Sequence, residues 1–461
     1  MHEKRRRPQM QLLPGIFLLL LAAGDVAAVG INYGTLGDNL PPPKTVAKML
    51  QSTLIDQVKI YDTNPDILAA FSNTGIDLVV AVENAHVANL TRSPDAADRW
   101  LAARVTPFLP ATSVVAVAVG NEFLTQDGAT LADFSLLVPA MRNLHRALQS
   151  RGLHRKIKVS TPHSMGVLAS SFPPSSAAFL DELRGTMSEL VDFLMETDSP
   201  FMINAYPYFA YRDNPSKIDL EYALLGDVSG AKRVHDPKGY IYTNMLDAQI
   251  DAVRAAIVSL NRTGGVRVAV SESGWPSRGG AFATPENARA YNMRLISRGE
   301  ARAGTPMAPE SNVDVFVFSL FNEDKKEGDP TERGFGLFNA DGTKAYEMDL
   351  SCSFCSGEKV SFGGSAGRGG PSVWCLAKPH ADERMLQAVL DFCCGPGGVD
   401  CGEVRGKGAC FEPDKLYAHA SYAMNAYYQM HGRNYWNCDF KGIGLVTFSD
   451  PSYGSCRYPQ Q

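Results

Sequence analysis

The segment VVAVAVGNE, residues 114–122, is a run of apolar and β-branched residues that ends in a carboxylate. Because apolar residues follow one another without alternation, the run predicts a strand buried on both faces, as in a parallel sheet. Seven similar runs occur before residue 325: VGINY (29–33), QVKIYD (57–62), DLVVAVEN (77–84), KIKVSTPH (156–163), MINAYPYF (202–209), VRVAVSESGW (266–275) and VDVFVFSLFNE (313–323).

Segments with helical patterning separate these runs, for example residues 93–109 and 243–260. The first opens with Ser93 and Pro94, a favourable pair for an N-cap and a first turn. Alternation of strand and helix predicts a parallel sheet, and eight repeats predict a (β/α)8 barrel over residues 29–350. An open, doubly wound sheet is the alternative, and the lack of a GxGxxG motif after the first strand disfavours it.

The chain has 461 residues, of which 45% are hydrophobic, and a formal net charge of −5. Its length predicts two domains, and the mild acidity gives no reason to expect a nucleic-acid partner. Residues 1–28 carry a basic head (Lys4 to Arg7), an apolar stretch at 12–24 and small residues before position 29. This layout predicts a secretory signal peptide. The alternative, a membrane anchor, requires a longer apolar stretch. We therefore expect a secreted protein, extracellular or in a cell wall.

The composition changes after Leu350. Residues 351–372 are rich in Gly and Ser, which predicts a flexible linker. All nine cysteines lie beyond residue 351, and the cysteine-dense segment 373–458 predicts a small module held together by disulfides. An odd number leaves at least one thiol free or paired between chains. The cysteine and histidine spacings match no metal motif, so no metal or cofactor is expected.

The chain end and two short motifs give further expectations. The chain ends without a hydrophobic tail, so no lipid anchor is expected. Asn89 and Asn261 each open an N-x-[ST] triplet and are candidate glycosylation sites.

Two glutamates close predicted strands. Glu122 ends the fourth run, and Glu272 lies near the end of the seventh. The carboxyl ends of barrel strands form the active site of this fold, so both side chains are expected at the same mouth. Either one alone could instead cap a helix or pair with an arginine. Together they match glycoside hydrolysis, in which one carboxyl group protonates the leaving oxygen and the other attacks the anomeric carbon or activates water.

The runs also carry a family resemblance. The first 350 residues resemble plant β-1,3-glucanases of glycoside hydrolase family 17, a retaining (β/α)8 family, and the resemblance covers residues 30–350 in order. It implies that Glu122 is the acid/base and Glu272 the nucleophile. The matching segments are INYGTLGDNLP (31–41), VKIYDTNPDIL (58–68), VAVGNEF (117–123), MINAYPYFAY (202–211), VAVSESGWPS (268–277) and FVFSLFNEDKKEGDPTERGFGLF (316–338).

The same resemblance implies roles for other residues. Asn121 is expected to bind the 2-hydroxyl of the sugar beside the nucleophile. A charged cluster beside the nucleophile is expected to favour its ionised form, although a solvated run of charges is the alternative. Aromatic rings are expected to line the glucan groove, although such rings often belong to the core. The cluster is Glu323, Lys326 and Glu332, and the rings are Tyr33, Tyr206, Phe209 and Phe321. Glu83, at the end of the third run, is an extra carboxylate with no counterpart in the family pattern as we know it.

Residues 373–458 resemble the callose-binding module, carbohydrate-binding module family 43. The segments VWCLAK (373–378), LDFCCG (390–395), ASYAMNAYYQ (420–429) and DPSYGSC (450–456) carry this resemblance. It implies three disulfides and leaves Cys352, Cys355 and Cys393 unassigned. The helical spacing of Tyr422, Tyr427 and Tyr428 favours helix core over a sugar platform. The six cysteines expected in disulfides are Cys375, Cys394, Cys401, Cys410, Cys438 and Cys456.

The leading hypothesis is a monomeric, endo-acting and retaining glucanase that hydrolyses the β-1,3-glucan (callose) of plant cell walls, with an appended glucan-binding module. A transglycosylase with the same carboxylates is the alternative within the enzyme class. A catalytically idle glucan-binding protein of the cell wall is the non-enzymatic alternative, and the presence of both glutamates disfavours it.

Overall fold

The computed structural model describes residues 29–262, 265–350, 374–378, 381–431, 436–440, 443–447 and 451–460. The predicted signal peptide (1–28) and linker (351–372), which includes Cys352 and Cys355, lie outside the described residues. Within the described ranges, no helix combines the length and the apolar character that crossing a bilayer requires.

A parallel sheet forms the centre of the larger unit. Its order is β5-β4-β3-β2-β1-β13-β12-β9-β6. The outermost members, β5 and β6, are separated along the chain only by Thr161, so they are two parts of one strand and the sheet closes into a barrel. The strands are β1 (Val29–Asn32), β2 (Gln57–Lys59), β3 (Asp77–Val82), β4 (Ser113–Val119), β5 (Lys158–Ser160), β6 (Pro162–Ser164), β9 (Phe201–Asn204), β12 (Val268–Ser273) and β13 (Val315–Val317).

Each of the eight predicted runs overlaps a barrel strand, and β4 and β9 begin one residue before their runs. This agreement confirms the predicted (β/α)8 class. Every residue of β1, β9 and β12 is buried, as the unbroken apolar runs predicted. A small cluster drawn from β3, β4, β9 and β13 includes Val79, Ala118, Met202 and Phe316. Because these strands lie on different sides of the ring, the cluster fills the barrel interior. A larger core lies between the sheet and the helices.

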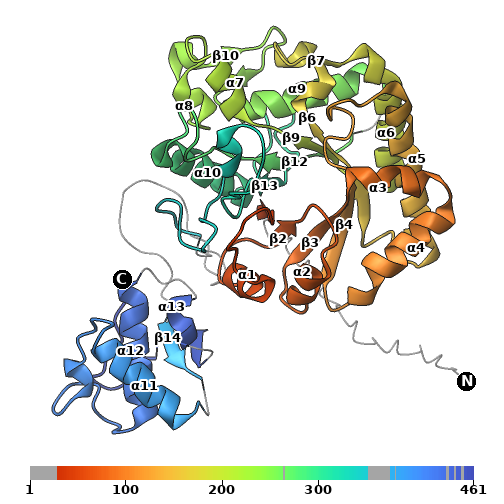
Figure 1. The fold of residues 1–461 in the computed structure, drawn as a ribbon. Coiled ribbons are helices and arrows are strands. Elements are labelled where there is room, and N and C mark those ends of the chain that lie inside the picture. Colours follow the sequence, from red (N-terminus) through yellow and green to blue (C-terminus); the bar gives the residue numbers. More distant parts are fainter. Residues whose placement is uncertain are drawn as a thin grey trace, which may run out of the picture.

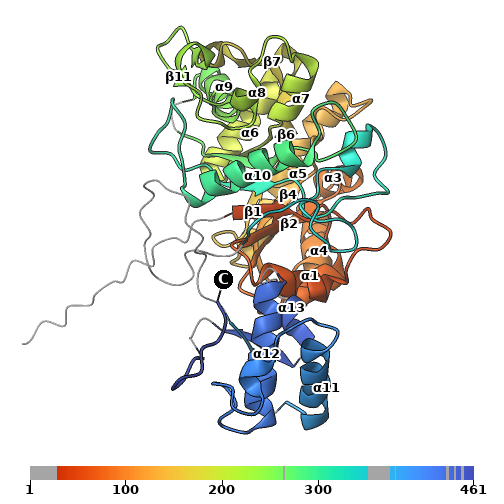
Figure 2. The ribbon, with the colours of Figure 1, turned by 90° about the vertical axis from the view of Figure 1, so that its left-hand side faces the viewer.

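Helices surround the barrel (Figures 1 and 2). The side chain of Ser93 accepts a hydrogen bond from the backbone N–H of Ala96 and so caps α4, as predicted. Asn244 caps α9 in the same way through Asp247 N. The helices of this unit are α1 (Pro43–Leu50), α2 (Pro65–Ala70), α3 (Asn84–Thr91), α4 (Pro94–Arg104), α5 (Leu131–Ser150), α6 (Arg184–Thr197), α7 (Pro207–Asp213), α8 (Leu220–Ala223), α9 (Met245–Ser259) and α10 (Pro285–Glu300).

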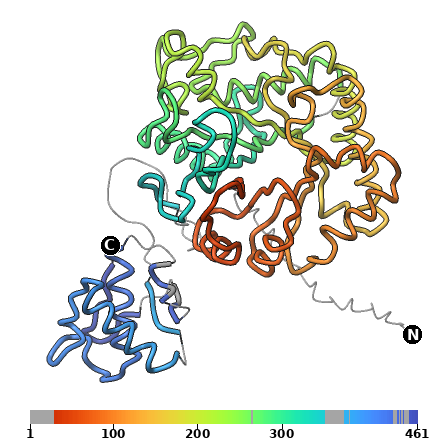
Figure 3. The backbone as a smooth tube through the Cα atoms, viewed as in Figure 1, coloured from red at the N-terminus to blue at the C-terminus, as the bar shows by residue number. Residues whose placement is uncertain are grey.

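Long segments at the barrel mouth connect strands to helices. Two short hairpins lie in them, β7 (Leu168–Ser170) with β8 (Ala178–Phe179) and β10 (Val234–His235) with β11 (Ile241–Tyr242). The segment after β13 returns to the segment that follows β1, where Lys325 N donates to Leu36 O at 2.9 Å. Figure 3 shows the segment after β13 (teal) beside the segment after β1 (red).

The smaller unit contains a two-stranded antiparallel sheet of β14 (Trp374–Ala377) and β15 (Gly444–Thr447), with helices α11 (Glu383–Cys394), α12 (Leu416–Met430) and α13 (Trp436–Asp439). Its disulfides join Cys375 to Cys438, Cys394 to Cys401 and Cys410 to Cys456.

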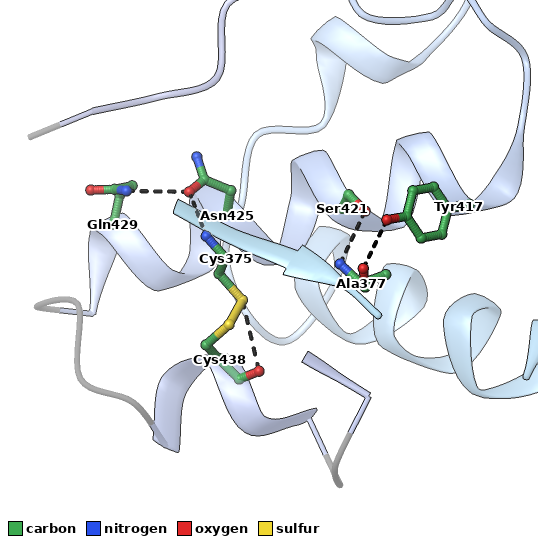
Figure 4. Close-up of a disulfide and its surroundings, with 7 residues drawn as sticks. All are labelled: Cys375, Ala377, Tyr417, Ser421, Asn425, Gln429 and Cys438. Carbon is green, nitrogen blue, oxygen red and sulfur yellow. Dashed lines mark hydrogen bonds between the residues drawn. A yellow bond between two sulfur atoms is a disulfide. The ribbon is translucent and has the colours of Figure 1, made fainter. Parts of the chain in front are cut away.

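Side chains of α12 form hydrogen bonds with the backbone of β14 near the Cys375–Cys438 disulfide. Asn425 Oδ1 accepts the backbone N–H of Cys375, and Ser421 Oγ accepts that of Ala377 (Figure 4). On the same helix, Tyr422 and Tyr428 are buried in the two core clusters and Tyr427 is half-buried. Cys393 is a buried free thiol, and its burial raises the pKa of that thiol to about 12.

Candidate active site

Glu122 lies on a sharp turn that follows β4. Gly120 and Glu122 both adopt left-handed backbone conformations, with φ of 70° and 51°. Only glycine fits at position 120, because a Cβ there would lie 2.9 Å from Asn84 Oδ1 in addition to requiring a positive φ. The Glu122 N–H donates to the Pro162 carbonyl oxygen of β6 at 2.9 Å. The turn therefore places the Glu122 side chain on the wall of the cavity at the barrel mouth.

The environment of Glu122 favours its protonated form. Its Oε1 accepts a hydrogen bond of 2.8 Å from Asn204 Nδ2, at the end of β9. Burial and the charge of Glu272 raise the pKa of Glu122 above its ordinary value, and together they outweigh the lowering effect of that hydrogen bond. A carboxyl group with a raised pKa can donate a proton near neutral pH.

Glu272 lies within β12, is 5% exposed and is surrounded by donors. Lys59 Nζ and Tyr61 OH contact its Oε1 at 2.7 and 2.9 Å, and Tyr206 OH contacts its Oε2 at 2.8 Å. Burial alone raises the pKa of Glu272, but the charge of Lys59 and these hydrogen bonds lower it by more, so the pKa lies below its ordinary value. The carboxylate is therefore held ionised.

Both glutamates line one cavity of about 550 Å³. Asn204 links Glu122 to the residue before Glu272, because its Oδ1 accepts from Ser271 Oγ at 2.6 Å while its amide nitrogen donates to Glu122. Asn121 also lines the cavity, and its Oδ1 is buried without a protein partner. The remaining wall consists of Ser164, Met165, Gly166, Ser171, Asn204, Tyr206, Phe209, Ala210, Gln249, Phe318, Lys326, Glu332 and Phe335.

The predicted charged cluster is only partly at the cavity. Lys326 and Glu332 line it and form an ion pair of 3.1 Å, with Lys326 Nζ 4.3 Å from the centroid of the Phe318 ring. Glu323 lies behind the wall, where its Oε1 accepts the Leu36 N–H at 2.8 Å. The expectation that this lysine acts on the nucleophile needs correction, since the cation in contact with Glu272 is Lys59.

The predicted aromatic residues also divide into two groups. Tyr206 and Phe209 line the cavity, with ring centroids 5.5 Å apart. Tyr33 and Phe321 are only 2% and 1% exposed and pack edge to face in the core. The structure therefore corrects the expectation that these two rings form part of the groove.

Three residues of the site were not predicted from the sequence: Lys59, Tyr61 and Asn204. The signal was present, because a lysine in the apolar run QVKIYD and an asparagine in MINAYPYF are polar residues inside buried strands. Such groups need partners, since an unpaired buried charge is costly. Lys59 is 0% exposed, and Asn204 is 2% exposed.

The remaining sequence candidates lie outside the cavity wall. Glu83 is at the start of α3, where it pairs with His86 at 3.2 Å. Asn89 on α3 and Asn261 after α9 are both exposed. In the part of the chain that the structure describes, no group of three or more His, Cys, Asp or Glu side chains is arranged to hold a metal ion.

Two family models match the chain. The model described as "Glycosyl hydrolases family 17" matches residues 29–350, and the model "X8 domain" matches residues 373–445. "Glucan endo-1,3-beta-glucosidase 12" of Arabidopsis thaliana is 41% identical, over 98% of this chain and 88% of the relative. "Glucan endo-1,3-beta-D-glucosidase" of Olea europaea is 39% identical, over 96% of both chains.

Solved structures agree with these matches. "CJP38, a beta-1,3-glucanase and allergen of Cryptomeria japonica pollen" has a TM-score of 0.67 at 40% identity and covers 70% of this chain and 99% of its own. A structure from a study of two plant beta-glucan endohydrolases has a TM-score of 0.62 at 38% identity, over 69% of this chain and 99% of its own.

Proposed function

The chain belongs to glycosyl hydrolases family 17, and on that basis we propose that it hydrolyses internal β-1,3-glucosidic bonds of β-1,3-glucan with retention of configuration. One observation carries the proposal. Two carboxyl groups line the same cavity, and their surroundings move their pKa values in opposite directions, Glu122 upward and Glu272 downward. Such a pair consists of a proton donor and an ionised nucleophile, the two groups that glycoside cleavage needs.

In the first step, the Glu272 carboxylate attacks the anomeric carbon. The bond between that carbon and the glycosidic oxygen breaks, and Glu122 gives its proton to the departing oxygen. The glucan fragment with the new hydroxyl leaves, and the other fragment is bound to Glu272 as an ester. Lys59, Tyr61 and Tyr206 position the carboxylate for this attack through the three contacts they make with it.

In the second step, Glu122 changes its role. The ester no longer carries the negative charge that raises the pKa of Glu122, so that pKa falls and Glu122 becomes a base. It takes a proton from water, the water oxygen attacks the anomeric carbon, and the bond to Glu272 breaks. The regenerated carboxylate returns to the same three donors, which stabilise it as its charge develops.

The cavity suits a glucan chain. The Oδ1 of Asn121 is buried without a protein partner, which supports a contact with a sugar hydroxyl once substrate is bound, and the family resemblance implies the 2-hydroxyl. Tyr206 and Phe209 provide flat apolar surface for sugar rings. Because β-1,3-glucan carries no charge, its binding does not require charged side chains beyond those of the cavity.

The X8 domain fits a role in holding the enzyme on its polymer. A second binding contact on the same chain of glucan becomes effectively intramolecular, and such linkage can raise avidity by roughly 10²–10⁴-fold. The three disulfides require an oxidising compartment. We therefore place the protein outside the cell, in the cell wall.

Product analysis on a linear β-1,3-glucan tests the proposal. Mass spectrometry of early time points is expected to show shorter oligosaccharides of mixed length, because cleavage is internal. Products longer than a defined starting oligosaccharide would identify a transglycosylase instead, and glucose alone would indicate attack at chain ends. The Glu272→Gln variant is the matched control and is expected to give no products. It should stay folded with a lowered melting temperature, because Lys59 is left buried without its anion.

A further inference from the structure

The turn that carries Glu122 begins where the β3–β4 ladder ends. The two strands pair in parallel from Asp77 and Ser113 to Val82 and Val119. The last bond of the ladder joins Gly120 N to Val82 O at 2.9 Å. Beyond this point the chain after β3 enters α3, so the backbone of Asn121 has no neighbouring strand to pair with.

The side chain of Asn84 replaces that missing strand. Its Oδ1 accepts the backbone N–H of Asn121 at 2.7 Å, and its Nδ2 donates to the backbone oxygen of Asn121 at 3.0 Å. The same nitrogen also donates to Gln126 Oε1 at 2.9 Å, on the chain that follows the turn. One amide group therefore binds both backbone groups of a single residue, as a paired strand would.

This contact fixes an unfavourable backbone conformation. Asn121 lies between Gly120 and Glu122, which have φ of 70° and 51°. A left-handed conformation is uncommon for a residue other than glycine, and it persists only where the surrounding structure holds it. The Asn84 amide fixes the backbone of Asn121, and the hydrogen bond from Glu122 N to Pro162 O fixes the next residue of the turn.

We propose that Asn84 is a positioning residue that holds the turn in the conformation from which Glu122 protonates the leaving oxygen. The inference rests on the proposed roles of Glu122 and Glu272. Asn84 is not part of the cavity wall, so its effect on the reaction passes through the backbone of Asn121. Only an amide satisfies all three contacts, because they require an acceptor and a two-proton donor on one short side chain.

Leaving-group dependence tests this role. A dinitrophenyl leaving group needs no proton, whereas a glucan fragment does, so loss of a positioned acid affects only the second substrate. For Asn84→Ala, kcat/KM on a laminari-oligosaccharide is expected to fall by about 10–100-fold, since a misplacement of 1 Å can cost that much. On dinitrophenyl β-laminaribioside the fall is expected to be below about 3-fold.

A second variant gives an independent readout. Asn84→Asp keeps the acceptor for Asn121 N, loses both donated bonds and adds a negative charge beside the turn. The added charge raises the pKa of Glu122, so the alkaline limb of the kcat/KM profile is expected to move to higher pH. Because this charge acts on Glu122 through space whatever the role of the native amide, the shift reports only that position 84 lies close enough to influence Glu122, and the substrate selectivity of Asn84→Ala decides the role.

Two controls separate the possible failures. Asn143 is a buried asparagine on α5 whose Nδ2 donates to Leu90 O of α3 at 2.8 Å, so Asn143→Ala removes a comparable bond away from the turn. It is expected to lower the melting temperature and to leave both substrates equally affected. Glu122→Gln calibrates the effect of losing the acid.

The results for the Asn84 and Glu122 variants determine whether Asn84 positions Glu122. A selective loss in Asn84→Ala supports the inference. Equal losses on both substrates, or no loss, overturn it while leaving the roles of the glutamates intact, provided that Glu122→Gln shows the selective loss. If Glu122→Gln itself shows no selectivity, the proposed role of Glu122 fails and the inference fails with it.

Discussion

Replacement of Lys59 by methionine tests how the protein keeps Glu272 ionised. Lys59 is 0% exposed, and its Nζ lies 2.7 Å from Glu272 Oε1. Methionine preserves most of the volume of the side chain and removes the charge. Glu272 would then remain buried with the hydroxyl groups of Tyr61 and Tyr206 as donors and with no cation in contact.

The expected magnitude follows from the burial of the pair. Removing one partner of a buried ion pair costs about 3–5 kcal/mol, because the remaining charge is left without compensation. At 1.36 kcal/mol per tenfold change, this corresponds to a loss of about 10²–10⁴-fold in the stabilisation of ionised Glu272. We expect the acid limb of the kcat/KM profile to move to higher pH by about 2–4 pH units, and kcat/KM near neutral pH to fall by the fraction of Glu272 that becomes protonated.

Stability provides a second readout with a defined sign. In the wild type, the pKa of Glu272 lies below its ordinary value of 4.5, so its contribution to folding is present above pH 4.5 and is lost as the pH falls through the folded pKa. In Lys59→Met the folded pKa lies above the ordinary value, and the buried carboxylate destabilises the protein at neutral pH. The difference in unfolding free energy between the two proteins is therefore expected to shrink as the pH falls.

The assay is urea unfolding and initial-rate kinetics between pH 4 and pH 8. Lys158→Met is the matched control, because Lys158 also lies on a barrel strand but pairs at 3.3 Å with Asp198, whose side chain is 81% exposed. Surface pairs contribute about 0–1 kcal/mol, so this variant is expected to resemble the wild type. An unmoved acid limb in Lys59→Met, or a stability deficit that is independent of pH, would refute the reasoning.

Three further outcomes are expected. On a laminari-oligosaccharide the wild-type profile of kcat/KM against pH should be bell-shaped, with the acid limb set by Glu272 and the alkaline limb by Glu122; on a dinitrophenyl substrate, which needs no proton, the acid limb alone should remain, and an alkaline limb there would contradict the assignment of Glu122. A reductant should remove the thermal transition of the module, because losing a native disulfide costs roughly 2–5 kcal/mol, and should leave the barrel active on soluble oligosaccharide; loss of both together would mean that they unfold as one unit. Truncation after Leu350 should weaken binding to insoluble glucan and leave the rate on short oligosaccharides unchanged; an equal loss on both would mean that the module supports the barrel.

The barrel strands were predictable because burial on both faces leaves a clear pattern. The run at 114–122 covers all of β4 except Ser113 and ends in Glu122, and the run at 266–275 contains β12 with Glu272. The break in the fifth run at Thr161 was not predictable, because it depends on how the ring closes between β4 and β9.

The site itself was only partly predictable. The two glutamates are marked by their position at strand ends, but their partners come from other strands. Lys59 is 213 residues from Glu272 in the sequence, and the spacing of residues along a strand does not reveal which charge it meets across the barrel. Tyr33 was assigned to the groove from its residue type, although its burial depends on packing against Phe321.

Trapping of the covalent intermediate shows whether Glu272 is the nucleophile. A laminaribioside with fluorine at position 2 and a dinitrophenyl leaving group forms the ester quickly and hydrolyses slowly, so the labelled enzyme accumulates. We expect one added glycosyl mass, which tandem mass spectrometry of the peptide containing residues 268–277 assigns to Glu272. A label on any other residue, or a first-formed product of inverted configuration with no label, would contradict it.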